Sequence, residues 1–192
     1  MRTAGAASWQ ITTDVPQVLA VALYIRDVAG VAQTASPVGL AEVVPSVTRA
    51  GAVPALPEVT AQWNSWWARA LTTGPDALEE LEPPHFSTFA DATALQDLLR
   101  AHLHAALRWS SEVKRSSALA TRGGLPLGKL VSEIEHRTGR VARPFRLRLD
   151  VVPVAGRDVW TVGHAHVLMS SALLDDPELL VAKLRPAVEV LV

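Results

Sequence analysis

The sequence predicts an α+β fold that is mostly helical, with a small antiparallel hairpin or sheet near the C-terminus. Long stretches of the first 140 residues carry apolar side chains at helical spacing. Between residues 145 and 169 the apolar residues instead alternate with polar ones, which is typical of strands. Glycine and proline separate these segments at positions where helices and strands usually end.

The composition is that of a folded chain. Of the 192 residues, 49% are hydrophobic and 19% are charged, which excludes wholesale disorder. This length suits one domain over residues 1–192, with a helical sub-lobe over 1–120 and a helix–hairpin–helix sub-lobe over 121–192. The 15 arginines against 3 lysines, and 24 valines against 3 isoleucines, indicate a bacterial genome of high GC content.

Cysteine is absent from the sequence. Disulfides, thiol catalysis and cysteine-ligated zinc are therefore excluded, and a reducing compartment is favoured. The apolar run over residues 18–25 is too short to span a bilayer, and Asp14 stands where a secretory signal would carry positive charge. We therefore expect a cytoplasmic protein with no membrane partner.

The first predicted helix runs over residues 14–28. Asp14 suits the N-cap and Pro16 the first turn, and apolar residues cover nearly every side of the helix. A helix of this kind is usually central in a core. The five glycines and prolines between residues 31 and 56 then predict a long irregular connection.

Two further helices are predicted over residues 57–73 and 88–115. The first places Trp63, Trp66 and Trp67 on one face together with aliphatic residues, which predicts that all three are buried. The second carries a wide apolar stripe at helical spacing and is the longest in the chain.

The C-terminal third is predicted to contain two more helices. One runs over residues 127–138 and is ended by Gly139. The last begins at Asp176 and Pro177, and Pro186 is expected to kink or split it.

Two strands are predicted between these helices. Residues 145–151 alternate apolar and charged side chains, so that Arg146 and Arg148 share an outer face. Residues 155–158 form a turn, and residues 159–169 resume as a strand that is interrupted near Gly163. A β-hairpin between these two strands is the simplest arrangement.

Charge is unevenly distributed although the net charge is −1. Residues 1–107 carry 5 basic and 10 acidic side chains, residues 108–157 carry 11 and 4, and residues 158–192 carry 2 and 5. A cluster within the basic segment provides the candidate partner-binding residues, which are Arg137, Arg140, Arg143, Arg146, Arg148 and Arg157. Such a face can dock an acidic protein surface, neutralise phosphates, or pair internally with acidic side chains.

Two motifs point weakly to ligands. Residues 123–129 match the spacing of a phosphate-binding loop, but Leu130 stands where a hydroxyl is needed for magnesium, so we reject nucleotide hydrolysis. His164 and His166 lie two apart on a predicted strand, where both rings can point the same way. Zinc needs a third protein ligand from elsewhere. We therefore expect no metal and no cofactor, with this histidine pair as the alternative.

We interpret the chain as a non-enzymatic protein-interaction or structural accessory protein. Its basic C-terminal hairpin region would dock a partner, either another protein or a second copy of the chain. Two alternatives stay open, namely a nucleic-acid-binding protein that uses the same arginine face, and an enzyme with a dispersed site. The sequence contains neither Gly-x-Ser-x-Gly nor His-Glu-x-x-His to support hydrolytic chemistry.

Overall fold

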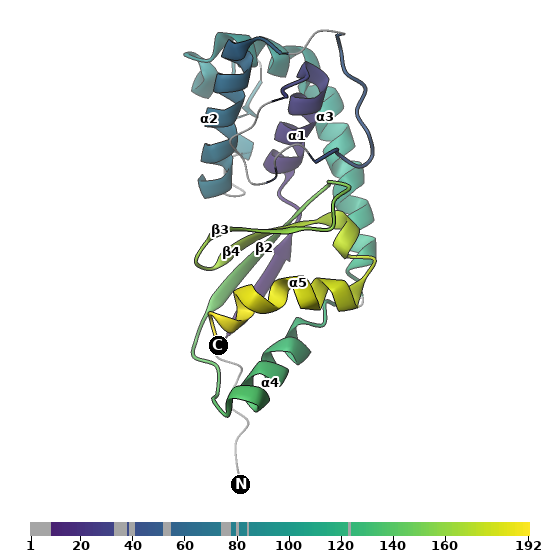
Figure 1. Cartoon of the computed structure of the whole chain (residues 1–192). Coiled ribbons are helices and arrows are strands. Elements are labelled where there is room, and N and C mark those ends of the chain that lie inside the picture. The colour runs from purple at the N-terminus through teal and green to yellow at the C-terminus, as the bar shows by residue number, and fades with distance from the viewer. Residues whose placement is uncertain are drawn as a thin grey trace.

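The computed structural model describes residues 9–32, 38, 41–51, 55–73, 78, 79, 81–83, 85–122 and 124–192. Within this part of the chain, five α-helices accompany a four-stranded mixed sheet, which confirms the α+β prediction (Figure 1). The helices are α1 (Gln17–Ala29), α2 (Pro57–Thr73), α3 (Thr93–Ala120), α4 (Leu127–Thr138) and α5 (Pro177–Glu189). The strands are β1 (Gln10–Asp14), β2 (Arg146–Val152), β3 (Val159–Gly163) and β4 (His166–Ser170).

The sheet is larger than the predicted hairpin, and its strands pair differently. The strand order is β1-β2-β4-β3, with β2 parallel to both β1 and β4. The predicted antiparallel hairpin between residues 145–151 and 159–169 is therefore wrong, because β2 pairs in parallel with β4 and does not pair with β3. The antiparallel hairpin lies within residues 159–170, because the interruption near Gly163 is the turn between β3 and β4.

The N-terminal strand β1 was not predicted. Asp14, expected to cap a helix, is the last residue of β1, and Pro16 occupies the N-cap position of α1. Residues from both predicted sub-lobes therefore contribute strands to one sheet, since Gln10 pairs in register with Arg146. Buried apolar side chains from the helices and from the sheet form one continuous cluster.

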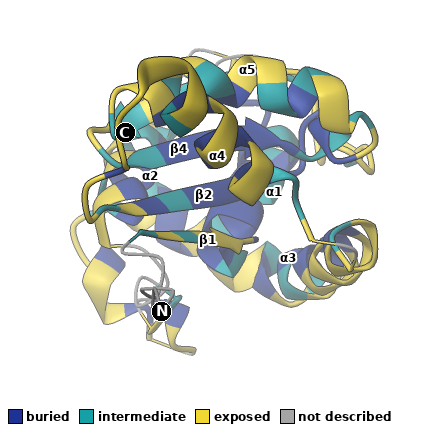
Figure 2. Ribbon diagram, turned by 90° about the horizontal axis from the view of Figure 1, so that it is seen from below, coloured by how far each residue is buried: buried dark blue, intermediate teal, exposed yellow. Residues whose placement is uncertain are grey.

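Side-chain alternation gives the sheet two different faces. Leu147, Leu149 and Val151 of β2 point to one face and are almost completely buried. Trp9 lies on this side, stacks on Phe145 at a centroid distance of 6.0 Å, and reaches α4. Figure 2 shows α4 and α5 in front of the sheet when it is seen from below, so these two helices cover the apolar face. The opposite face carries the polar residues of β1 and β2 together with Val152 and Leu168, which are fully buried.

The helix α1 is the centre of the helical part, as its apolar pattern predicted. It packs against α3 and α2, and its residues from Val18 to Leu23 are at most 1% exposed. The predicted burial of the α2 tryptophans is also confirmed, with Trp63 and Trp67 stacked at 5.3 Å. Trp63 donates its indole N–H to the carbonyl oxygen of Ala22 at 2.8 Å, which joins α2 to α1.

Three other predictions about helices and loops have different outcomes. The longest helix, α3, starts five residues later and ends five residues later than predicted. Pro186 does not split the last helix, because α5 continues through it to Glu189. The described residues between 31 and 56 contain no helix or named strand, only a bridge between Val43 and Val154, as expected for an irregular connection.

Replacing Trp63 by alanine tests the contact between α1 and α2. We expect Trp63→Ala to lower the free energy of unfolding by about 3–5 kcal/mol, because it leaves a large cavity and removes the bond to Ala22. Urea unfolding measures this loss. Trp160→Ala is the matched control, because Trp160 is only half-buried and its loss should be clearly smaller. Equal losses in the two variants would contradict this view of the core.

Candidate interaction surface

The loop that connects α4 to β2 is held in place by contacts within the chain, and we call it the pinned loop. Gly139 ends α4 in the left-handed region with a φ of 65°, a conformation that glycine adopts without strain. Three residues later, Ala142 is 4% exposed and donates its backbone N–H to the Glu135 carboxylate at 2.7 Å. These contacts hold the loop so that Arg140, Val141 and Arg143 face solvent.

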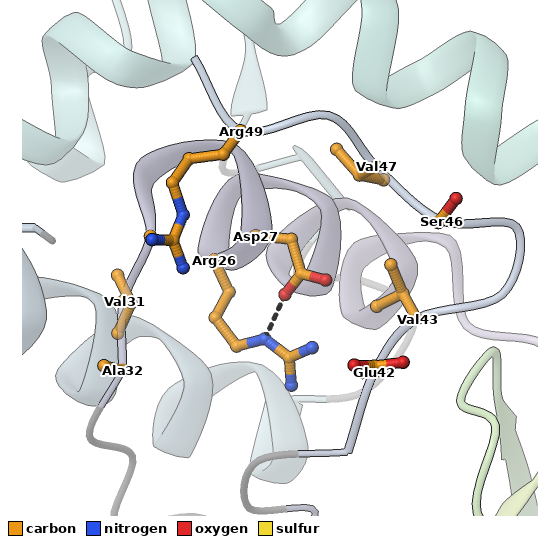
Figure 3. A pocket seen from close by; sticks show the side chains of 10 residues that line it. Arg26, Asp27, Val31, Ala32, Glu42, Val43, Ser46, Val47 and Arg49 are labelled. Carbon is orange, nitrogen blue, oxygen red and sulfur yellow. Dashed lines mark hydrogen bonds and ion pairs between the residues drawn. The ribbon is translucent and has the colours of Figure 1, made fainter. Parts of the chain in front are cut away.

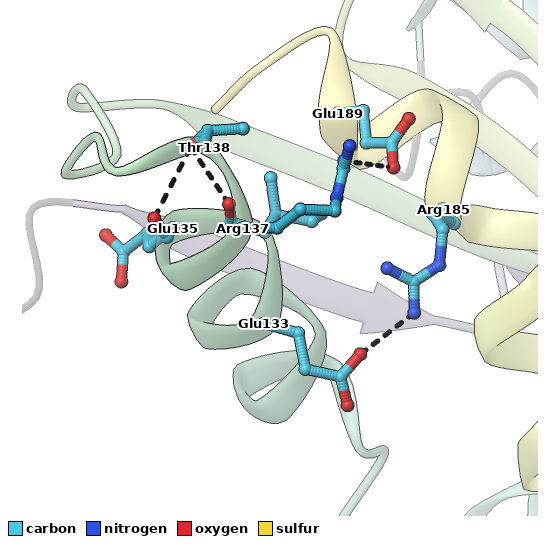
Figure 4. Close-up of polar contacts among 7 residues, drawn as sticks. Glu133, Glu135, Arg137, Thr138, Arg185 and Glu189 are labelled. Carbon is cyan, nitrogen blue, oxygen red and sulfur yellow. Dashed lines mark hydrogen bonds and ion pairs between the residues drawn. The ribbon is translucent and has the colours of Figure 1, made fainter.

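Ion pairs join α4 to α5 beside this loop. Arg137 lies 2.6 Å from Glu189, and Arg185 lies 2.8 Å from Glu133 (Figure 4). Each pair is exposed, and such pairs typically contribute 0–1 kcal/mol. Arg137, one of the six candidate arginines, is therefore already paired within the chain.

Arg148 is also paired internally, on the polar face of the sheet. Its Nε and Nη2 lie 2.9 and 2.7 Å from the two carboxylate oxygens of Asp150. His166 of β4 lies opposite Arg148, and its Nε2 is 2.8 Å from the same carboxylate. Asp150 is 0% exposed, so Arg148 and His166 supply the partners that a buried carboxylate needs.

Arg157 lies at the far end of the sheet from the pinned loop. It follows the C-terminal end of β2 and pairs with Asp176 at 3.3 Å. The Asp176 carboxylate also accepts the backbone N–H of Leu179 at 3.1 Å and caps α5, as the sequence predicted. Arg157 thus belongs to a different surface from the arginines of the loop.

The other three candidate arginines have no acidic partner in the described part of the chain. Arg140, Arg143 and Arg146 are exposed, and no carboxylate among the described residues lies within ion-pair distance of any of them. Val141 lies between two of them and is 83% exposed, an unusual exposure for a large aliphatic side chain. Val190, which follows Glu189 at the end of α5, is 71% exposed. We call these five residues the loop patch.

The histidine pair is separated by the hairpin turn. His164 lies in the turn between β3 and β4 and is exposed, whereas only His166 is in a strand. The prediction that both lie on one strand is therefore wrong. Among the described residues, no group of three or more metal-ligating side chains is found. Of the phosphate-loop motif, Lys129 is exposed on α4 and Gly123 lies outside the described residues.

Sequence reasoning missed a pocket at the end of α1 that has several charged side chains in its lining. It has a volume of about 510 Å³, and Arg26, Asp27, Glu42 and Arg49 contribute its charged lining (Figure 3). Arg26 is only 4% exposed, pairs with Asp27 at 2.5 Å and donates to the carbonyl oxygen of Ala41 at 2.8 Å. These bonds attach the irregular connection to α1, so Arg26 has a structural role that its position in an apolar helix did not reveal.

Comparisons with known proteins provide no further guide to the site. No protein-family model matches the chain, and no significant match is found among curated protein sequences or solved structures. None of the helices in the described ranges is both long enough and apolar enough to cross a membrane.

Asparagine in place of Asp150 tests the buried pairing on the polar face. We expect Asp150→Asn to lower the free energy of unfolding by about 2–3 kcal/mol, because Arg148 loses its counter-charge and His166 loses its carboxylate partner, although both side chains can still reach water. Urea unfolding measures the change. Asp97→Asn is the control, since Asp97 forms an exposed pair with Arg100. Similar losses in both variants would show that burial of Asp150 is unimportant.

Proposed function

We propose that this chain is a non-enzymatic interaction or accessory protein that docks a partner protein through the loop patch. One observation carries the proposal: Arg140, Arg143 and Arg146 are exposed, have no acidic partner among the described residues, and lie within five residues of Val141, which is 83% exposed on a loop held by internal contacts. The cytoplasm stays the proposed place of action, because the cysteine-free composition fits a reducing compartment.

The mixture of charge and apolar surface favours a protein partner. Arginine is enriched at protein interfaces, where its weakly hydrated guanidinium binds carboxylates with two parallel hydrogen bonds. Phosphates would use the arginines equally well, but they offer no apolar contact to Val141 and Val190. We therefore expect a partner surface with carboxylates around an apolar side chain.

The internal contacts of the pinned loop favour tight binding of the partner protein. A flexible loop loses conformational entropy when it binds, and this loss subtracts from the binding free energy. Because Gly139 sets the chain direction and Ala142 is buried and bonded to Glu135, part of that ordering is already present in the free protein. Arg140 and Val141 are thus presented in a defined geometry.

Reversing the charge of the three unpaired arginines tests the proposal. We expect the triple variant Arg140→Glu, Arg143→Glu, Arg146→Glu to fold normally and to lose its partner, because repulsion replaces attraction at the centre of the patch. The measurement is a pull-down from a nuclease-treated lysate of the native host, followed by mass spectrometry. Arg148 is left unchanged, because its bond to buried Asp150 would confuse loss of binding with loss of structure.

A second triple variant is the matched control for this charge reversal. Arg108, Arg115 and Arg122 are also exposed, and reversing these three makes the same change in net charge at another surface. The control should retain a stoichiometric partner protein. If both variants retain it, the loop patch is not the docking surface. If the wild type retains only nucleic acid before nuclease treatment, with affinity falling steeply with salt, the nucleic-acid alternative replaces this proposal.

Truncation of Val141 tests the apolar part of the patch separately. We expect Val141→Ala to weaken partner binding about tenfold, since burying two methyl groups contributes about 1.5 kcal/mol. The free energy of unfolding should not change, because the side chain is exposed. Calorimetric titration with the identified partner measures the affinity. Leu119→Ala, at a 51% exposed residue of α3, should leave the affinity unchanged, and equal effects would contradict the assignment.

A further inference from the structure

One edge of the strand β1 has backbone groups that no described residue pairs with. The backbone N–H of Gln10 donates to the carbonyl oxygen of Phe145 at 2.9 Å. In a parallel strand, every second residue directs its backbone hydrogen bonds to the adjacent strand on the same side. Thr12 and Asp14 therefore also bond to β2. The N–H and C=O groups of Ile11 and Thr13 therefore point away from the sheet. Within the described part of the chain, neither residue makes a hydrogen bond with these groups.

This edge lacks the features that usually protect an edge strand. β1 has the sequence Gln-Ile-Thr-Thr-Asp, with no proline, no bulge and no charge before its last residue. Four of its five residues are exposed. The other edge strand, β3, differs because its ladder is irregular between Thr161 and Gly163 and because α5 packs beside it. At its C-terminal end, Asp14 pairs with Lys114 of α3 at 3.3 Å, whereas the preceding residues of β1 leave the edge open for strand addition.

We propose that a second copy of this chain pairs with β1 through its own β1, antiparallel and around a twofold axis at Thr12. In this register Ile11 lies opposite Thr13 of the second copy, and Thr13 lies opposite its Ile11. Residues in such pairs exchange both backbone hydrogen bonds, so all the outward groups of the two strands are satisfied. The two four-stranded sheets become one sheet of eight strands. The interface is self-complementary, as twofold symmetry requires.

The side chains agree with this register. Thr12 meets Thr12 of the second copy, and Ile11 meets Thr13, which are favourable cross-strand pairs of β-branched residues. Gln10 meets Asp14 of the second copy, so that an amide donor faces a carboxylate that also pairs with Lys114 of its own chain, and no like charges are opposed. A shift of this register by two residues would leave outward backbone groups of the two β1 strands without partners. A shift by one residue would place the outward groups of one strand opposite residues whose own groups point inward. This inference is independent of the proposed function, because it uses neither the arginines nor Val141.

A single cysteine reports the register directly, because the native chain has none. In this register Thr12 faces Thr12 of the second copy without a backbone hydrogen bond between them. The Cα atoms of such antiparallel pairs lie about 4.5 Å apart, within the roughly 4.4–6.8 Å that a disulfide spans. We expect Thr12→Cys to form a covalent dimer when oxidised glutathione takes up the two protons and two electrons of the thiols. Thr13→Cys is the control, because its two thiols lie about 7 Å further apart along the strands.

A proline variant tests the hydrogen bonds without a cross-link. Thr13→Pro removes only an outward N–H, a position where an edge strand tolerates proline, so the monomer should stay folded. Light scattering after gel filtration should give twice the chain's 20.6 kDa for the wild type and for Thr13→Ala, but 20.6 kDa for the proline variant. A wild-type protein that is monomeric at all concentrations would overturn the proposal. Equal cross-linking of the two cysteine variants, or a dimer that survives Thr13→Pro, would also overturn it.

Discussion

The hydrogen bonding of β2 along both of its edges is the constraint from which the rest of the structure follows. β1 joins it from the start of the chain and β4 from near the end, so two distant regions are held by one strand. The alternation of β2 then sends Leu147 and Leu149 toward the helices that cover one face, and Arg146 and Arg148 toward the other. A shift by one residue would exchange these sets, so burial of the apolar face fixes where every charge of β2 lies.

This constraint explains why the six arginines are not equivalent. Asp150 follows Arg148 by two residues on the polar face, and its burial requires a bonded counter-charge. Arg148 supplies it and is held in the sheet, whereas Arg146 lies at the start of the strand and pairs with no carboxylate of the described residues. What looked like one basic surface in the sequence is therefore three internal ion pairs and one smaller patch beside the α4–β2 loop.

Local patterns predicted the helices better than they predicted the sheet. The bounds of α2 and α4 were predicted to the residue, because proline, glycine and a clear apolar face define both. β1 was missed because it is five residues long and has only one half-buried apolar side chain, which leaves no alternation to detect. Its partner begins 136 residues later, and no local pattern specifies strand order or direction at such a separation.

The same distinction applies to the candidate site. The sequence located the arginines, but it did not show that Glu189, 52 residues away, would pair with Arg137. Nor did it show that Glu135 would bond to Ala142 and turn Val141 outward. Composition and spacing thus identify a basic segment, whereas the choice between paired and unpaired arginines depends on which helices come together in the fold.

The loop patch and the β1 edge would reinforce each other if both act as proposed. Both lie near the start of β2, since Arg146 is the register partner of Gln10. Pairing of two copies through β1 would repeat the loop patch once in each half of a continuous sheet, in a fixed geometry set by the twofold axis. A partner with two acidic sites at the matching spacing would then gain from effective concentration, so that two individually weak patches could bind tightly. A patch of three arginines and two valines is small for a standard interface, and such repetition provides a physical route to adequate affinity.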